Sequence, residues 1–285
     1  MLLASIIVLG SLYALLGGGF VVIYRASRVL NFAHAEAVML AGYFGITVSG
    51  LIASPVIGLF TVLCCSFLLG LIIYALLIRP LAGYSILSTI ILTVAVGVVL
   101  NAVIVLGWRG STDPIPFGWR AYYLFPGGLR LSSSEITTIA ITFVFFIVMG
   151  LFYRYSKTGQ QMRATAERPL LAAQRGIKIY VISAVAWGIG FAAAGLAGVL
   201  LGINYTVSLQ MGGVAVVAFV VALVGGLDSL LGTLPAAFII AALKQLAITY
   251  TNPRLGETIP FIILLLVLMF KPWGLLGTKE ELERV

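Results

Sequence analysis

The chain has 285 residues and a formal net charge of +8; 61% of its residues are hydrophobic and 9% are charged. Soluble domains carry about 25% charged residues, so this composition excludes a soluble globular protein and indicates one that is embedded in lipid. The positive charge does not indicate nucleic-acid binding, because the basic residues lie in short gaps between apolar runs and form no Lys/Arg-rich tract.

A helix needs about 20 apolar residues to cross the hydrocarbon of a bilayer. Apolar runs of roughly this length occupy 2–23, 35–53, 56–78, 85–107, 136–153, 179–203, 213–231, 233–250 and 258–271. The run at 35–53 is interrupted by glycines and follows polar residues. The sequence therefore predicts an all-α, polytopic membrane bundle, a single domain over 1–285, with about eight or nine transmembrane segments. A broken or re-entrant segment is expected near 24–53.

Polar residues gather between the first two apolar runs, from Tyr24 to Glu36. Such side chains are costly in lipid, so they should face protein or a water-filled cavity. A broken helix here would leave backbone groups free to meet a solute, whereas the alternative is a plain cytoplasmic loop. The candidate path residues in this stretch are Ser27, Asn31, Phe32, His34 and Glu36.

The next polar features are Asn101 and the gap at 108–135. Asn101 lies within an apolar run and is either a path residue or a polar group that joins two helices. The gap is rich in Trp, Tyr, Pro and Gly. It is predicted to be an extracytoplasmic loop that forms an interfacial aromatic belt, a docking surface for an extracytoplasmic partner, or both.

The gap at 154–178 carries six basic residues and one acid, Glu167. An excess of Lys and Arg is typical of cytoplasmic loops, so this gap is predicted to lie inside. Counting spans from it places 108–135 outside and the tail at 272–285 in the cytoplasm. With nine spans the N-terminus lies outside.

This basic gap is also predicted to be structured. Helix formers run from Lys157 to Glu167, Pro169 suits the first position of a second helix, and Gly176 fits its C-terminal cap. The interpretation is a coupling element that fits a soluble motor and exposes Arg163, while the alternative is a basic anchor on anionic lipid. The candidate coupling residues are Gly159, Met162, Arg163, Ala166, Glu167, Arg168, Pro169 and Gly176.

Two glycine-rich features follow. Gly190, Ala194, Gly198 and Gly202 recur every four residues, and such a stripe favours close packing of helices in lipid. The turn at 225–232 is either a capped turn, in which side chains cap the following helix, or part of a path. Its candidate path residues are Gly225, Gly226, Asp228 and Ser229.

Catalytic motifs are absent from the sequence: it contains no HExxH, no G-x-S-x-G and no Walker A motif, and it has one histidine. Clusters of cysteine or other metal ligands are absent as well. We therefore expect a non-catalytic chain that binds no cofactor and no metal.

Four stretches resemble one family of membrane proteins. They are Gly10–Leu15 with Ile23–His34, the gap from Gly159 to Ile177, the turn Gly225–Gly232, and the ending Phe270–Gly277. In order and spacing they are similar to the permeases of branched-chain amino-acid ABC importers, of the LivH/LivM type and closer to LivH. Ala35 departs from the pattern, since relatives usually have glycine after the histidine.

The resemblance implies a set of partners and a place in the cell. The partners would be a LivM-type permease or a second copy of this chain, two cytoplasmic ATPases that bind ATP and Mg, and an extracytoplasmic solute-binding protein. The chain would be a multi-pass protein of the bacterial inner membrane, in contact with lipid and not with nucleic acid. The solute would be a branched-chain or related hydrophobic amino acid, although relatives also carry urea, amides and small organic acids.

Two other functions remain open at this point. An ion-coupled secondary transporter acting without an ATPase would need a buried acid, and only Glu36 and Asp228 are available. A scaffold that transports nothing is disfavoured by the polar stretches within and beside the spans.

Overall fold

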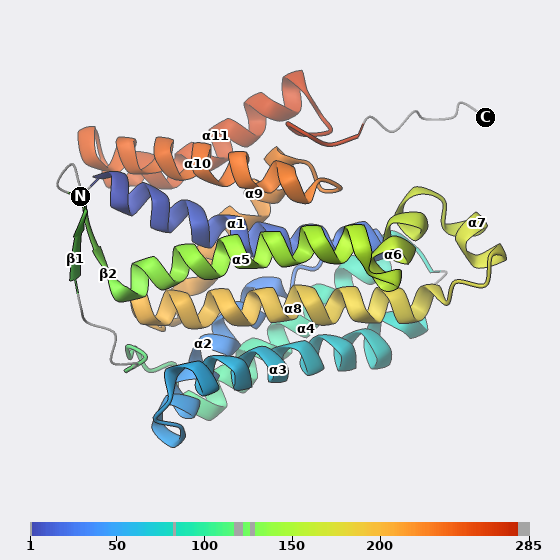
Figure 1. The fold of residues 1–285 in the computed structure, drawn as a ribbon, viewed down its shortest axis with the longest axis horizontal. Helices are drawn as coiled ribbons and strands as arrows, with labels where there is room; N and C mark the ends of the chain where they lie inside the picture. The colour runs from blue at the N-terminus through green and yellow to red at the C-terminus, as the bar shows by residue number, and fades with distance from the viewer. Residues whose placement is uncertain (1, 82–83, 117–121, 126–128, 279–285) are drawn as a thin grey trace.

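The computed structural model describes residues 2–81, 84–116, 122–125 and 129–278. Helices dominate it, and one short hairpin completes it (Figure 1). The elements are α1 (Leu2–Ser27), α2 (His34–Leu51), α3 (Pro55–Ile73), the π-helical turn η1 (Tyr74–Ile78), the 3-10 turn η2 (Arg79–Leu81), α4 (Ile86–Trp108), β1 (Tyr122–Phe125), β2 (Leu129–Ser132), α5 (Ser133–Tyr155), α6 (Lys157–Glu167), α7 (Pro169–Gln174), α8 (Ile179–Asn204), the 3-10 turn η3 (Leu209–Met211), α9 (Gly212–Gly225), α10 (Leu230–Tyr250) and α11 (Pro253–Phe270).

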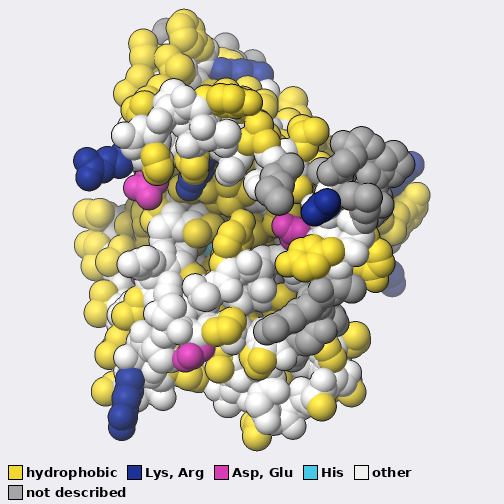
Figure 2. All heavy atoms as spheres, turned by 90° about the vertical axis from the view of Figure 1, so that its left-hand side faces the viewer, with side chains coloured by type: hydrophobic (Ala, Val, Ile, Leu, Met, Phe, Trp, Pro, Cys, Tyr) yellow, Lys and Arg dark blue, Asp and Glu magenta, His cyan; other side chains and the backbone are white. Residues whose placement is uncertain are grey.

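The long helices lie side by side, so the molecule has two distinct ends (Figure 1). The β1–β2 hairpin and the start of α1 lie at one end, here called the hairpin end. The short helices α6 and α7 lie at the other, here called the α6–α7 end. The hairpin pairs antiparallel from Tyr122 with Ser132 to Phe125 with Leu129. Figure 2 looks onto the hairpin end, where charged side chains are scattered singly among hydrophobic ones.

Among the described residues, seven helices are long and apolar enough to cross a membrane: α1, α3 extended through η1 and η2, α4, α5, α8, α10 and α11. Helix α2 is outside this group because of the polar residues at its start. Helix α9 is outside it because it has only 14 residues. The predicted all-α membrane bundle is confirmed, while the count of eight or nine segments stays a prediction. The hairpin was not predicted, and Trp119 of the predicted outer loop lies outside the described residues.

The break predicted near 24–53 lies ahead of the second helix and not within it. Helix α2 continues through Gly42 and Gly45, and the non-helical residues 28–33 lie inside the predicted range. Both glycines allow neighbouring segments to pack closely against α2. A Cβ atom would lie 3.3 Å from Val207 at Gly42 and 2.9 Å from Ile115 at Gly45.

Helix α8 lies at the centre of the bundle, against α1, α2 and α3, and most of its residues are buried. Its small residues permit backbone contact. A Cβ at Gly198 would lie 2.2 Å from the carbonyl oxygen of Val38, and one at Gly190 would lie 2.4 Å from Ile23. Gly202 approaches Ile115 in the same way, and Ala194 is fully enclosed. The predicted packing stripe thus lies in close contacts of α8, and Gly195 adds another against Ser66 of α3.

Gly198→Ala should destabilise the protein by about 1–3 kcal/mol, because the added methyl group overpacks a contact with backbone, which cannot rotate away. The matched control is Gly150→Ala in α5, where a Cβ meets nothing within 4 Å. The midpoint of thermal unfolding in detergent measures the effect. Equal midpoints for the two variants would contradict the assigned role of α8.

Candidate functional site

Residues 28–33, between α1 and α2, are not helical and are called the break from here on. Arg28 takes a left-handed conformation with φ of 55°, and the chain turns back along α1. His34, the first residue of α2, then reaches Gly19, where a Cβ would lie 3.0 Å from the His34 Cε1 atom. Gly19 lies eight residues before the end of α1, which corresponds to about 12 Å at 1.5 Å per residue. Non-helical backbone therefore lies inside the bundle, alongside the last turns of α1.

Side chains supply the hydrogen bonds that this backbone lacks. The Thr93 hydroxyl of α4 accepts a bond from the Phe32 amide at 3.3 Å and lies 3.3 Å from the Leu30 carbonyl oxygen. The Asn31 Oδ1 atom accepts a bond from the Ala33 amide at 3.1 Å. Irregular backbone at membrane depth is tolerated only where it is buried in protein or lines a cavity. Thr93 was not predicted, because a single threonine in an apolar run carries no distinctive signal.

Two side chains of this stretch are buried without the partners that they could bind. Asn31 is 1% exposed and His34 is 0% exposed. Among the described residues, neither the Asn31 Nδ2 atom nor either ring nitrogen of His34 has a hydrogen-bond partner. The His34 ring instead packs against Phe20, with ring centroids 4.2 Å apart, and against Phe191. Buried polar groups are normally paired, so these atoms are available to bind another polar group.

A cavity of about 90 Å³ adjoins the break, between α1, α2 and α9. Phe219 connects its aromatic wall, with ring centroids 5.4 Å from Phe20 and 5.6 Å from Phe32. The cavity is lined by Phe20, Leu30, Asn31, Phe32, Ala35, Ala215, Val216 and Phe219. Two predicted residues, Asn31 and Phe32, therefore meet here with phenylalanines from α1 and α9 that sequence reasoning did not select.

The other predicted residues of this region are placed differently. Ser27 accepts a hydrogen bond from the Trp187 indole at 3.2 Å, so it joins α1 to α8. The Glu36 carboxylate lies against α4, where a Cβ at Gly97 would be 3.1 Å from its Oε2 atom. Asn101 is half-buried further along α4 and does not line the cavity beside the break.

The predicted helix–turn–helix is present as α6 and α7, with the expected boundaries at Glu167, Pro169 and Gly176. Ser156 caps α6 by accepting a bond from the Gly159 amide at 2.9 Å. Gly176 has φ of 80°, which glycine adopts without strain. These local signals explain why this element was readable from the sequence.

The candidate coupling residues fall on two faces of α6. Met162 is 1% exposed and Gly159 abuts the Phe152 carbonyl oxygen of α5, so both attach α6 to the bundle. Ala166 offers its carbonyl oxygen to Arg28, whose Nη2 atom donates a bond of 3.1 Å. On α6, Arg163 and Glu167 are exposed, and the candidates beyond its end, Arg168, Pro169 and Gly176, are exposed as well. The break and α6 are thus in direct contact.

The glycine turn after α9 is a capped turn joined to the segment that follows α11. Ser229 caps α10 through the Gly232 amide at 3.1 Å. The Leu276 amide donates to the Gly225 carbonyl oxygen at 3.1 Å, and Thr278 donates to the Asp228 carboxylate. Gly225 and Gly226 leave no room for a Cβ. These contacts give all four candidates of this turn a structural role, and their role in a path stays a prediction.

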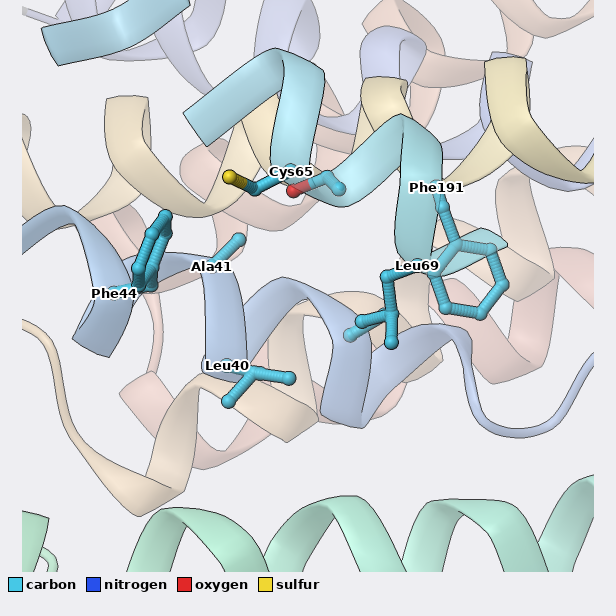
Figure 3. A pocket seen from close by; sticks show the side chains of 8 residues that line it. Leu40, Ala41, Phe44, Cys65, Leu69 and Phe191 are labelled. Atoms are coloured by element: carbon cyan, nitrogen blue, oxygen red, sulfur yellow. The ribbon is translucent and has the colours of Figure 1, made fainter. Parts of the chain in front are cut away.

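A larger apolar cavity of about 210 Å³ lies between α2, α3 and α8 (Figure 3). Its wall carries Ala37, Leu40, Ala41, Phe44, Cys65, Ser66, Leu69 and Phe191. No predicted path residue lines it, because its wall lacks the polar pattern on which the sequence analysis relied.

Thr93→Val should lower the free energy of unfolding by about 1 kcal/mol, because it removes the acceptor of the Phe32 amide while keeping the side-chain shape. Thr61→Val is the matched control, since the Thr61 hydroxyl is exposed and bonds only the Ile57 carbonyl oxygen of its own helix. Denaturant unfolding in detergent compares the two. A loss that is equally small in both variants would show that Thr93 does not hold the break.

The comparisons with known proteins agree with this architecture. The family model described as "Branched-chain amino acid transport system / permease component" matches residues 2–268. The chain is 29% identical to the high-affinity branched-chain amino acid transport system permease protein LivH of Salmonella typhimurium and 28% identical to that of Escherichia coli K12, over 98% of this chain and 95% of each relative. It is also 28% identical to BraD of Pseudomonas aeruginosa, over 97% of this chain and 94% of that protein.

No solved structure matches the chain. The family model nevertheless covers the bundle from α1 into α11, including the break, α6, α7 and the glycine turn. The chain therefore belongs to the family of permease components of branched-chain amino acid transport systems.

Proposed function

We propose that this chain is the membrane permease of an ATP-driven importer for branched-chain or related hydrophobic amino acids. The observation that carries the proposal is the contact between Arg28 of the break and the Ala166 carbonyl oxygen of α6. It joins an exposed helical element outside the bundle to irregular backbone inside it. The named function of the relatives, branched-chain amino acid transport, supports the choice of solute.

The orientation that we propose has the α6–α7 end in the cytoplasm of a bacterial cell and the hairpin end outside. Its support is the distribution of charge, since cytoplasmic segments carry an excess of Lys and Arg. The hairpin end has Arg109, Arg130 and Arg254, among described residues. The α6–α7 end and the segments next to it have Arg25, Arg28, Arg79, Arg154, Lys157, Arg163, Arg168, Arg175, Lys178 and Lys271. The tail from 272 would then also be cytoplasmic.

The proposed assembly contains two cytoplasmic ATPases, a second permease of the LivM type or another copy of this chain, and an extracytoplasmic binding protein. ATP and Mg would be bound by the ATPases, and this chain would carry no cofactor of its own. The exposed side of α6, with Arg163, Glu167 and Arg168, has the mixed charge that suits a protein cleft. A purely basic surface would suit anionic lipid better.

In the proposed mechanism, closure of the ATPases on ATP moves α6 as a rigid unit. Met162 and Gly159 would transmit this movement to α5, and Arg28 would transmit it to the break. The break is a suitable receiver, because its backbone is held by side chains such as Thr93 and not by a helical ladder. Repacking the break would then expose the path alternately to each side of the membrane.

The Arg163→Glu and Glu167→Lys variants should each lower ATP-dependent leucine uptake at least tenfold in liposomes that hold the complete complex. The reversed charges would weaken docking of the ATPases, so less ATPase should co-purify with the chain. Arg130→Glu, an exposed arginine at the hairpin end, is the matched control and should retain the ATPases.

Two outcomes would overturn the proposal. One is full uptake and full ATPase binding in both α6 variants. The other is leucine uptake by the purified chain alone under an ion gradient, which would establish a secondary transporter and draw attention to the half-buried Glu36.

A further inference from the structure

We infer that the cavity of about 90 Å³ beside the break is the pocket that selects the solute by its side chain, and that Asn31 binds the solute's carboxylate. The inference rests on the proposed function and deepens it, because it assigns the residues that would hold the branched side chain and the carboxylate of the solute. Nothing in the resemblance or in the relatives' names locates such a pocket.

The lining of the cavity decides which side chain fits. Its described wall holds three phenylalanines, three aliphatic or small residues from α2 and α9, Leu30 and a single polar residue, Asn31. No described charged residue lines it, so a charged side chain would lose its hydration without compensation. A branched aliphatic side chain gains contact with all three rings at no such cost. The small volume disfavours aromatic side chains.

The polar end of the solute would meet Asn31. The orientation of this amide is fixed, because its Oδ1 atom already accepts the bond from the Ala33 amide. Its Nδ2 atom is left buried without an acceptor among the described residues. An unpaired buried donor costs free energy, which a carboxylate arriving beside it would recover.

The start of α2 adds to this preference for an anionic group. Ala33 precedes α2 without a side-chain cap, and Ala35 in the first turn lines the cavity. The first amides of a helix have no partner within it and favour negative charge. Asn31 and Ala35 thus bring amide donors next to a cavity whose other lining side chains are apolar.

Phe32 is the side chain that would control access to the cavity. Its side chain is 41% exposed, whereas Phe20 opposite is 7% exposed. Phe32 can therefore change rotamer without disturbing the core, which would open a way to the Asn31 amide. Its amide remains attached to Thr93, so the backbone of the break need not move for this step.

The test uses the complete complex in liposomes, with uptake of radiolabelled leucine and phenylalanine measured as KM and kcat. Phe219→Ala enlarges the cavity and should shift the phenylalanine-to-leucine ratio of kcat/KM at least tenfold towards phenylalanine. Phe219→Trp fills the cavity and should raise KM for leucine at least tenfold. Phe143→Ala, at a 45% exposed phenylalanine of α5, is the control and should leave the ratio unchanged.

Asn31→Asp keeps the shape of the side chain but replaces the donor with a carboxylate. It should raise KM for leucine at least tenfold, while co-purification of the ATPases with the variant reports that the complex has assembled. Asn31→Gln retains a donor and should recover part of the loss.

The outcomes separate the inference from the function on which it rests. If the wild-type complex takes up neither amino acid with ATP, the proposed function itself fails. If wild-type uptake is intact but the Phe219 variants keep the wild-type ratio and Asn31→Asp keeps the wild-type KM, the pocket is wrong and the permease function stands.

Discussion

The close approach of α8 to its neighbours is the constraint on which the rest of this bundle depends. Lipid tails are as apolar as the helix surfaces, so burial of apolar area does not drive helices together in a membrane. Contact between backbones must do so instead, and Gly190 and Gly198 allow it against α1 and α2. Because α1 and α2 are both held by α8, the short stretch that connects them has almost no freedom. It must turn back into the bundle.

That geometry determines the hydrogen bonding of the break. A stretch which folds back beside α1 cannot form a helical ladder, so Thr93 and Asn31 replace the missing bonds. The replacement is incomplete: among the described residues, the Asn31 Nδ2 atom and both ring nitrogens of His34 have no hydrogen-bond partner. Arg28, at the start of the break, donates to the Ala166 carbonyl oxygen, so this region is also in contact with α6.

Local signals explain what could be predicted from the sequence. Apolar runs located the long helices, Pro169 and Gly176 bounded α7, and Ser229 marked the start of α10, because each of these features acts within a few residues of itself. The family resemblance added the identity of the permease, which the family model confirms. The role of Gly42 in packing could not be predicted, because a glycine that breaks a helix and one that packs it look alike in one dimension.

What could not be predicted depends on contacts between distant segments. Phe219 enters the cavity from another helix, and its sequence neighbours are ordinary apolar residues. The glycine turn was left open between a cap and a path, because its partner is Thr278, 50 residues away from Asp228. No periodicity or motif spacing records such a pairing, since it exists only after the helices between the two segments have packed.

This pairing has a consequence for how the protein is made. The segment that meets the turn after α9 leaves the ribosome only after α10 and α11 have been synthesised, so the turn remains without its partner while both helices insert. Closure of the Asp228–Thr278 contact therefore marks the moment when the last two helices have reached their places. A nascent chain in which either helix inserts the wrong way round would keep Asp228 and Thr278 apart and leave the glycine turn without this contact.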